Sequence, residues 1–208
     1  MTSFAVRRDV RLYLPAKRAI DIVLAALMLL LAAPLLALIA IAIYVESPGP
    51  ILHTAPRTGQ HGRRFMMLKF RTMVPNAEEL KASLQHLSIV PWPDFKVIGD
   101  PRITRVGRLL RATSLDELPQ LWNVLIGDMS LVGPRPTSFA VETYDLWHTT
   151  RLEVRPGITG YWQVRGRNAA AFDDRLRMDL AYLREMSLTT DVLIMLSTAF
   201  AVVRREGA

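Results

Sequence analysis

Two adjacent carboxylates, Asp116 and Glu117, lie near the start of the stretch TSLDELPQLWN at residues 113–123. Ser114 followed three residues later by Glu117 has the pattern of a helix capping box, and both acids would be favoured by the helix dipole. In a second interpretation, one carboxylate attacks a phosphorus atom while its neighbour holds a divalent cation at the same phosphate. The spacing alone leaves both interpretations open.

The chain also carries many cations that could bring an anion to these acids. It has 26 Lys and Arg against 19 Asp and Glu, a formal net charge of +7. This excess indicates anionic partners, among them phosphorylated substrates, lipid head groups and nucleic acids. Arg135 differs from the other cations because a proline on each side restricts its backbone, which favours two-point binding of phosphate. For Lys69, Arg71, Arg155, Arg165 and Arg167, a solvated or head-group-binding surface is the simpler interpretation.

The composition excludes several other kinds of site. There is no cysteine, which excludes disulfides, thiol nucleophiles and thiolate metal sites. The four histidines are scattered without HExxH spacing, and there is no glycine-rich phosphate loop of the Walker or dinucleotide kind. Any metal is therefore expected to be a hard cation held by carboxylate and phosphate oxygens. The four tryptophans are expected in the core or at a membrane interface.

Residues 22–45 form an uncharged apolar run that is long enough to cross a membrane as a helix. Basic residues flank both ends of the run, so the positive-inside rule gives no orientation. Pro34, near the middle, removes one backbone hydrogen bond and bends or breaks the helix. We predict a re-entrant helix that turns at Ala33 and Pro34 and leaves the membrane on the side where it entered. A simple transmembrane helix is the alternative.

The rest of the sequence predicts short helices joined by turns. Residues 47–77 contain no acidic side chain and are expected to lie against anionic head groups or a polyphosphate. Helices are predicted at residues 76–86, 105–110, 115–126, 138–154 and 173–186, a strand at residues 161–164, and an interfacial apolar helix at residues 188–203.

Three blocks of the sequence resemble the bacterial sugar transferase family, the monotopic phosphoglycosyl transferases. The longest runs from residue 100 to residue 136 and reads DPRITRVGRLLRATSLDELPQLWNVLIGDMSLVGPRP. KFRTM at residues 69–73 and RPGITGYWQVRGR at residues 155–167 are similar to two further family blocks, in the same order. The resemblance extends from about residue 15 to the C-terminus.

The resemblance implies a reaction at the cytoplasmic face of the bacterial inner membrane. Such enzymes transfer a sugar 1-phosphate from a UDP-sugar to polyprenyl (undecaprenyl) phosphate and release UMP, as the first membrane step of exopolysaccharide, O-antigen or glycoprotein glycan assembly. By resemblance, Asp116 would attack the β-phosphate and form a phosphosugar-aspartyl intermediate. Glu117 would help hold Mg²⁺, and Arg135 would neutralise phosphate charge. The other expected substrate phosphate-binding residues are Lys69, Arg71, Gln163, Arg167 and, less directly, Asp179.

The expected fold is mainly α with a little β. Residues 1–46 would form a basic N-terminus and the re-entrant, monotopic membrane helix, broken at Pro34. Residues 47–208 would form a small cytoplasmic catalytic domain with amphipathic interfacial helices. Many family members have Ser-Pro at the bend where this chain has Ala33-Pro34. The loss of the serine hydroxyl removes a group that could bond a freed carbonyl.

The resemblance also sets the expected partners. They are a UDP-sugar, polyprenyl phosphate and membrane lipids, with a second copy of the chain in a homodimer as a further candidate and no nucleic acid. Two alternatives belong to other functional classes. One is a membrane-tethered nucleic-acid-binding protein, although the sequence has no recognisable reading helix or aromatic RNA-binding block. The other is a non-catalytic membrane scaffold on the same fold.

Overall fold

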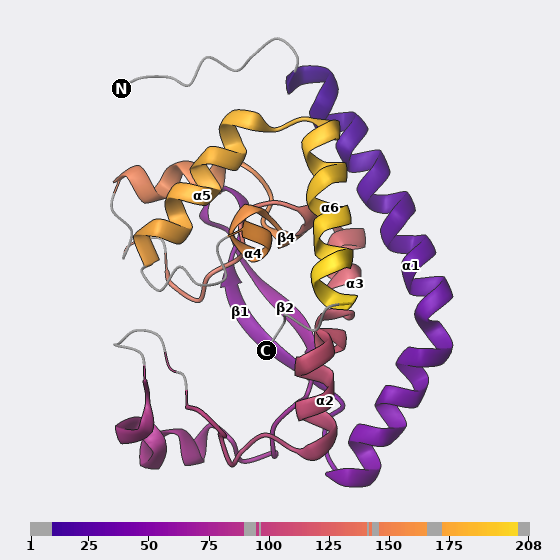
Figure 1. Cartoon of the computed structure of the whole chain (residues 1–208), viewed down its shortest axis with the longest axis vertical. Helices are drawn as coiled ribbons and strands as arrows, with labels where there is room; N and C mark the ends of the chain where they lie inside the picture. The colour runs from indigo at the N-terminus through magenta and orange to yellow at the C-terminus, as the bar shows by residue number, and fades with distance from the viewer. Residues whose placement is uncertain are drawn as a thin grey trace.

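A computed structural model describes residues 10–89, 95, 97–140, 142, 146–165 and 172–203 of the 208-residue chain. The prediction of a mainly helical fold with little β structure is confirmed. One long N-terminal helix runs along a group of short helices and two small sheets (Figure 1).

The elements follow one another along the chain in a fixed order. They are α1 (Val10–Glu46), β1 (Leu52–Thr58), η1 (Gln60–Gly62), β2 (Arg64–Phe70), η2 (Glu79–Leu87), α2 (Arg105–Thr113), η3 (Leu115–Glu117), α3 (Gln120–Ile126), β3 (Ser130–Val132), η5 (Leu146–Glu153), β4 (Gly157–Thr159), α4 (Tyr161–Arg165), α5 (Phe172–Glu185) and α6 (Leu188–Val203), where η marks a 3₁₀ helix.

Helix α1 is continuous over 37 residues, with Pro15 and Pro34 inside it. Figure 1 shows that it bows around one side of the molecule, so the chain bends without a break in the helix. Residues 12–46 are long and apolar enough to cross a membrane, with a mean hydropathy of 2.9 in the most apolar window. In the middle of the helix, Leu30 and Leu31 expose more than two thirds of their surface.

The first third of α1 is hydrogen-bonded to the rest of the fold. Arg18 donates to the carbonyl oxygens of Val124 and Leu125, the last turn of α3, at 2.6 and 2.9 Å. Asp21 is buried and accepts from the Ser130 hydroxyl at 2.7 Å and from the Leu131 N–H at 3.1 Å. These bonds attach α1 to α3 and β3.

A cluster of polar side chains also joins the start of α1 to α6. Lys17 lies 2.8 Å from Asp191, and the Tyr13 hydroxyl donates to the same carboxylate at 2.9 Å. Tyr182, from α5, donates to the other oxygen of Asp191 at 2.8 Å. The segment that precedes the apolar run therefore contacts α5 and α6.

The last turns of α1 contact the same fold at a distant point. The Glu46 carboxylate accepts from the N–H groups of Arg105 and Val106 at 2.7 and 2.9 Å, at the N-terminus of α2, where a negative charge is favourable. Ile39 and Ile43 are buried in a small apolar cluster with residues of β2 and α2. Both ends of α1 are thus bound to one folded unit.

The two sheets organise the interior. Strands β1 and β2 form an antiparallel hairpin, and β3 and β4 are parallel. The parallel pair lies very close to the following turn, since a Cβ on Gly157 would lie 2.1 Å from the Gly133 nitrogen. The main core cluster contains Ala25, Phe65, Met67, Leu121, Val124, Met129, Leu131, Val132, Tyr161, Tyr182 and Ile194.

Some sequence predictions of local structure were wrong. The strand predicted at residues 161–164 is the helix α4, and the strand β4 lies just before it. The α-helix predicted at residues 138–154 is not seen in the described part of that range, where the helix η5 is of the 3₁₀ type. The β1–β2 hairpin within residues 47–77 was not predicted, and η2 is a 3₁₀ helix where an α-helix was expected. The helices predicted at residues 105–110 and 173–186 are confirmed.

Candidate active site

The acidic pair lies in a tight turn between two helices. Ser114, at the end of α2, adopts a left-handed conformation with φ of 56° and makes no side-chain capping bond to the following turn. The capping-box prediction is therefore wrong, because the serine that should cap the helix instead turns the chain. Asp116 and Glu117 lie in η3, and α3 begins only at Gln120.

Asp116 is buried and lies near a single lysine. Only 8% of its surface is exposed, and the Lys69 ammonium nitrogen lies 4.0 Å from its Oδ2 atom. Burial raises the pKa of the Asp116 carboxyl, and Lys69 and Arg111 oppose this effect only in part. Asp116 is thus a weakly solvated carboxylate whose charge depends on nearby cations.

Glu117 is neutralised by two cations. Its Oε1 atom lies 2.7 Å from the Lys69 nitrogen and 2.7 Å from Nη2 of Arg135. Burial alone would raise the pKa of Glu117, but Arg135 and Lys69 together hold it well below its usual range. Asp116 and Glu117 therefore differ in character, although they are adjacent in the sequence.

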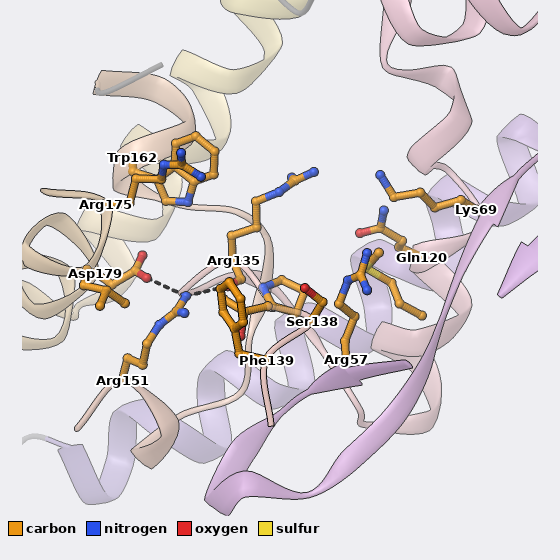
Figure 2. A pocket seen from close by; sticks show the side chains of 14 residues that line it. Arg57, Lys69, Gln120, Arg135, Ser138, Phe139, Arg151, Trp162, Arg175 and Asp179 are labelled. Atoms are coloured by element: carbon orange, nitrogen blue, oxygen red, sulfur yellow. Dashed lines mark hydrogen bonds and ion pairs between the residues drawn. The ribbon is translucent and has the colours of Figure 1, made fainter. Parts of the chain in front are cut away.

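A cavity of about 200 Å³ lies beside these groups, and its lining, among the described residues, includes five basic side chains and a single carboxylate. Figure 2 shows Arg135 in its centre, Lys69 and Gln120 on one side, and Trp162 and Asp179 on the other. The two acids do not line the cavity themselves, but Lys69 and Arg135 do line it and contact Glu117. The cavity is thus suited to bind an anion. An anion that binds Lys69 and Arg135 would lie next to the two acids.

The Pro-Arg-Pro turn that carries Arg135 is held from behind. Asp179 is almost fully buried, and its Oδ2 atom lies 2.6 Å from Nη2 of Arg151. The same Arg151 nitrogen donates to the backbone carbonyl of Arg135. Burial raises the pKa of Asp179 to about 6, against the opposing effect of Arg151. Asp179 thus positions the turn through Arg151.

The structure brings together Asp116, Glu117, Lys69, Arg135 and Asp179. Arg71 and Gln163 are buried and are not among the residues that line the cavity. Arg71 donates to the Ser47 carbonyl, at the exit of α1. Arg167 lies outside the described residues.

Several residues of the site were not predicted. Arg57, Arg151, Arg175 and Gln120 line the cavity, and none of them was singled out as a phosphate-binding residue. Trp162 was expected in the core or at a membrane interface, but it lines the cavity with the guanidinium carbons of Arg135 and Arg175 at 5.9 and 5.5 Å from its ring centre. The one sequence feature that could have indicated Arg57 as a phosphate-binding residue is its place in the acid-free stretch of residues 47–77.

The site offers few protein ligands for a divalent cation. Within the part of the chain that the structure describes, no group of three or more His, Cys, Asp or Glu side chains could hold a metal. Mg²⁺ commonly takes only one or two protein carboxylates and completes its shell with substrate phosphates and water. Asp116 and Glu117 fit such a site, in which a phosphate would displace the cations from Glu117.

Comparison with known proteins shows the family to which the chain belongs. The family model described as "Bacterial sugar transferase" matches residues 12–205, so the chain belongs to this family. It is similar to the Salmonella typhimurium protein named "Undecaprenyl-phosphate galactose phosphotransferase", with 44% identity over 197 residues. That alignment covers 92% of this chain and 41% of the relative. The chain thus spans about two fifths of the length of that protein.

Two other relatives are more completely covered. The Caulobacter vibrioides protein named "UDP-glucose:undecaprenyl-phosphate glucose-1-phosphate transferase" is 42% identical over 203 residues, which cover 92% of this chain and 71% of the relative. The Rhizobium meliloti "Exopolysaccharide production protein ExoY" is 38% identical over 198 residues, which cover 93% of this chain and 88% of the relative.

Proposed function

We propose that this chain transfers a sugar 1-phosphate from a UDP-sugar to polyprenyl (undecaprenyl) phosphate and releases UMP. The main support is a buried carboxylate, Asp116, which lies 4.0 Å from the Lys69 nitrogen beside a cavity whose cations Lys69 and Arg135 also bind the neighbouring Glu117. The names of the Salmonella and Caulobacter relatives support the same substrate classes.

In this proposal, Asp116 is the nucleophile. One of its oxygens forms a bond to the β-phosphorus of the UDP-sugar, and the bond from that phosphorus to the bridging oxygen breaks. UMP leaves with the electron pair, and the sugar phosphate remains on Asp116. An oxygen of polyprenyl phosphate then attacks the same phosphorus and restores the carboxylate. Burial favours the attack step, because a weakly solvated carboxylate loses little hydration on approaching phosphorus.

Lys69 and Arg135 bring the substrate to Asp116. Both are bound to Glu117, and a diphosphate offers them more negative charge than a single carboxylate does. If both cations turn to the phosphates, the Glu117 carboxylate would be free to help hold Mg²⁺. Bound there, Mg²⁺ would neutralise part of the diphosphate charge.

We also infer that the protein is monotopic, at the cytoplasmic face of the inner membrane. Asp21 and Glu46, near opposite ends of the apolar segment, bond to the same folded unit. A helix that crossed the bilayer would place these residues on opposite faces, where one domain could not contact both. Leu193, Leu196 and Phe200 of α6 expose most of their surface, which supports contact of this helix with lipid.

The test is the intact mass of the purified protein after incubation with Mg²⁺ and a panel of UDP-sugars, without lipid acceptor. We expect the wild type to gain the mass of one sugar phosphate with its own substrate, and Asp116→Asn to gain none. Asp174→Asn, a partly exposed carboxylate on α5, is the matched control and should react like the wild type. If no adduct accumulates and no UMP is released when polyprenyl phosphate is added, the transferase proposal is wrong and a scaffold role is favoured.

A further inference from the structure

One face of the β1–β2 hairpin carries two cations into the cavity. Antiparallel pairing sets Ala55 opposite Met67 and His53 opposite Lys69, so Arg57, Met67 and Lys69 share a face, and all three line the cavity. Arg57 lies four residues along β1 from the partner of Lys69, so the two backbones are about 13 Å apart along the strand. The two side chains therefore enter the cavity from different ends of the hairpin.

These two cations differ in what they bind. Lys69 is paired with Glu117 at 2.7 Å. Among the residues that the structure describes, no carboxylate pairs with Arg57, whose Nη1 donates only to the carbonyl of its neighbour Pro56, at 3.0 Å. Burial, with repulsion from Arg135 and Arg64, lowers the pKa of Arg57. Arg57 is thus a half-buried cation that lacks an anion.

Gln120 supplies a second unused donor on the same wall. Only 2% of its surface is exposed, and its side-chain nitrogen is buried without an acceptor in the described part of the chain. In the view of Figure 2, its carboxamide lies between the Lys69 ammonium and the Arg57 guanidinium. A buried donor without an acceptor destabilises the fold, so its presence at a cavity wall indicates an acceptor supplied by a ligand.

We propose that Arg57 and Gln120 bind the phosphate of the departing nucleoside monophosphate. The inference rests on the proposed transfer reaction and adds the direction in which the UDP-sugar lies in the cavity. Its β-phosphate would lie at the Lys69 end, next to Asp116, and its α-phosphate toward Arg57. When the bond between the β-phosphorus and the bridging oxygen breaks, the electron pair and negative charge move onto the UMP phosphate. Arg57 and Gln120 stabilise this charge by donating hydrogen bonds to it.

The test is binding of UMP and of uridine to the full chain in detergent or lipid nanodiscs, measured by titration calorimetry. We expect Arg57→Gln and Gln120→Met to weaken UMP binding by roughly tenfold or more, as for loss of a charge-assisted hydrogen bond. Uridine, which has no phosphate, should bind these variants as it binds the wild type. Arg57→Lys should retain part of the UMP affinity because it keeps the charge. Arg63→Gln, which removes an exposed arginine from the same hairpin, is the matched control and should change neither.

Each other result has a definite meaning. If Arg57→Gln and Gln120→Met bind UMP as tightly as the wild type, or lose UMP and uridine to the same extent, the proposed subsite is wrong. If Arg57→Gln does not fold, Arg57→Lys and Gln120→Met decide the question by the same comparison. A wild type that transfers sugar phosphate while these variants bind UMP normally refutes only the subsite. A wild type that neither transfers sugar phosphate nor binds UMP refutes the proposed function as well.

Discussion

Nη2 of Arg135 lies 2.7 Å from Oε1 of Glu117, although the two residues belong to different turns of the chain. The backbone of the same turn is fixed from behind, because the Pro134 carbonyl accepts from the Gly157 N–H at 2.9 Å and the Arg135 carbonyl accepts from Arg151. Arg135 is therefore held both by its side chain and by its backbone. Such restraint is what a group needs if it is to bind phosphate with a defined geometry.

Replacing Arg135 by lysine should lower transfer even though the charge remains. A lysine has no planar fork with which to bind two phosphate oxygens together. We expect kcat/KM for the UDP-sugar to fall by about tenfold to a hundredfold. The measurement is UMP release at varied UDP-sugar concentration. Arg165→Lys is the control, because Arg165 is exposed and packs over the ring of Tyr161. Unchanged kcat/KM in Arg135→Lys would show that the fork is not used.

Activity should rise with pH around the pKa of Asp179, which burial places at about 6. The ionised carboxylate holds Arg151, and Arg151 holds the carbonyl of Arg135. We expect transfer to decrease below pH 6, and we expect this inflection to be absent from Asp179→Asn, whose rate should be low throughout. The measurement is the pH profile of kcat for both proteins. An unchanged acid limb in Asp179→Asn would assign it to Asp116, whose pKa is also raised.

The stability contribution of Asp179 should run in the opposite direction. Its folded pKa of about 6 lies above the ordinary value of 3.8, so the folded chain holds this proton more tightly than the unfolded chain does. The contribution is therefore most favourable below pH 4 and decreases as the pH rises through 6. Thermal unfolding across this range should show a smaller pH dependence in Asp179→Asn than in the wild type. Identical pH dependence in the two proteins would contradict the raised pKa.

Removing the Asp21 carboxylate should destabilise the protein without touching the cavity. Asp21→Ala leaves the buried Leu131 N–H without its side-chain acceptor and leaves the Ser130 hydroxyl only the Val132 carbonyl at 3.0 Å. We expect a loss of about 1–3 kcal/mol, which corresponds to roughly 2–4 °C in Tm per kcal/mol for a chain of this size. The measurement is thermal unfolding in detergent, with Glu79→Ala, an exposed acid on η2, as the control. Equal Tm values for Asp21→Ala and the wild type would mean that this contact does not hold α1.

The path of α1 in the membrane can be tested by cysteine labelling, because the chain has no cysteine of its own. Single cysteines are introduced at the exposed positions Leu14, Leu31 and His61. We expect an impermeant maleimide to label Leu14→Cys and His61→Cys from the same side of sealed vesicles and to leave Leu31→Cys unlabelled from either side. Labelling of Leu14→Cys and His61→Cys from opposite sides would show that α1 crosses the bilayer.

Much of the fold followed from local patterns. The apolar run predicted a long helix that is bent or broken at Pro34, and the helix is present but continuous there. The helices α2 and α5 were also predicted from the sequence. The placement of Asp116, Glu117 and Arg135 near one another followed from family resemblance, and no local pattern in the sequence required it.

The errors arose where tertiary contacts decide the conformation. Tyr161 and Trp162 favour a strand by local propensity, but Tyr161 packs edge-on against Tyr182 in the core and the segment is helical. Ser114 matched a capping pattern, yet it adopts a left-handed conformation because the chain turns there. Arg57 stood out in the sequence only by its place in the acid-free stretch, and Gln120 did not stand out at all. What distinguishes them is that, among the described residues, no carboxylate pairs with Arg57 and no acceptor meets the Gln120 side-chain nitrogen.

The attachment of α1 at both ends has a practical consequence for preparing the enzyme. Deleting residues 1–46 would not release a soluble catalytic domain. It would leave Asp191 without Lys17 and Tyr13, the last turn of α3 without Arg18, and the N-terminus of α2 without Glu46. Nor would an unrelated apolar helix restore these bonds if fused in its place. Helix α1 is thus joined to the folded unit at both ends although the middle of its apolar segment is exposed, and purification must retain it.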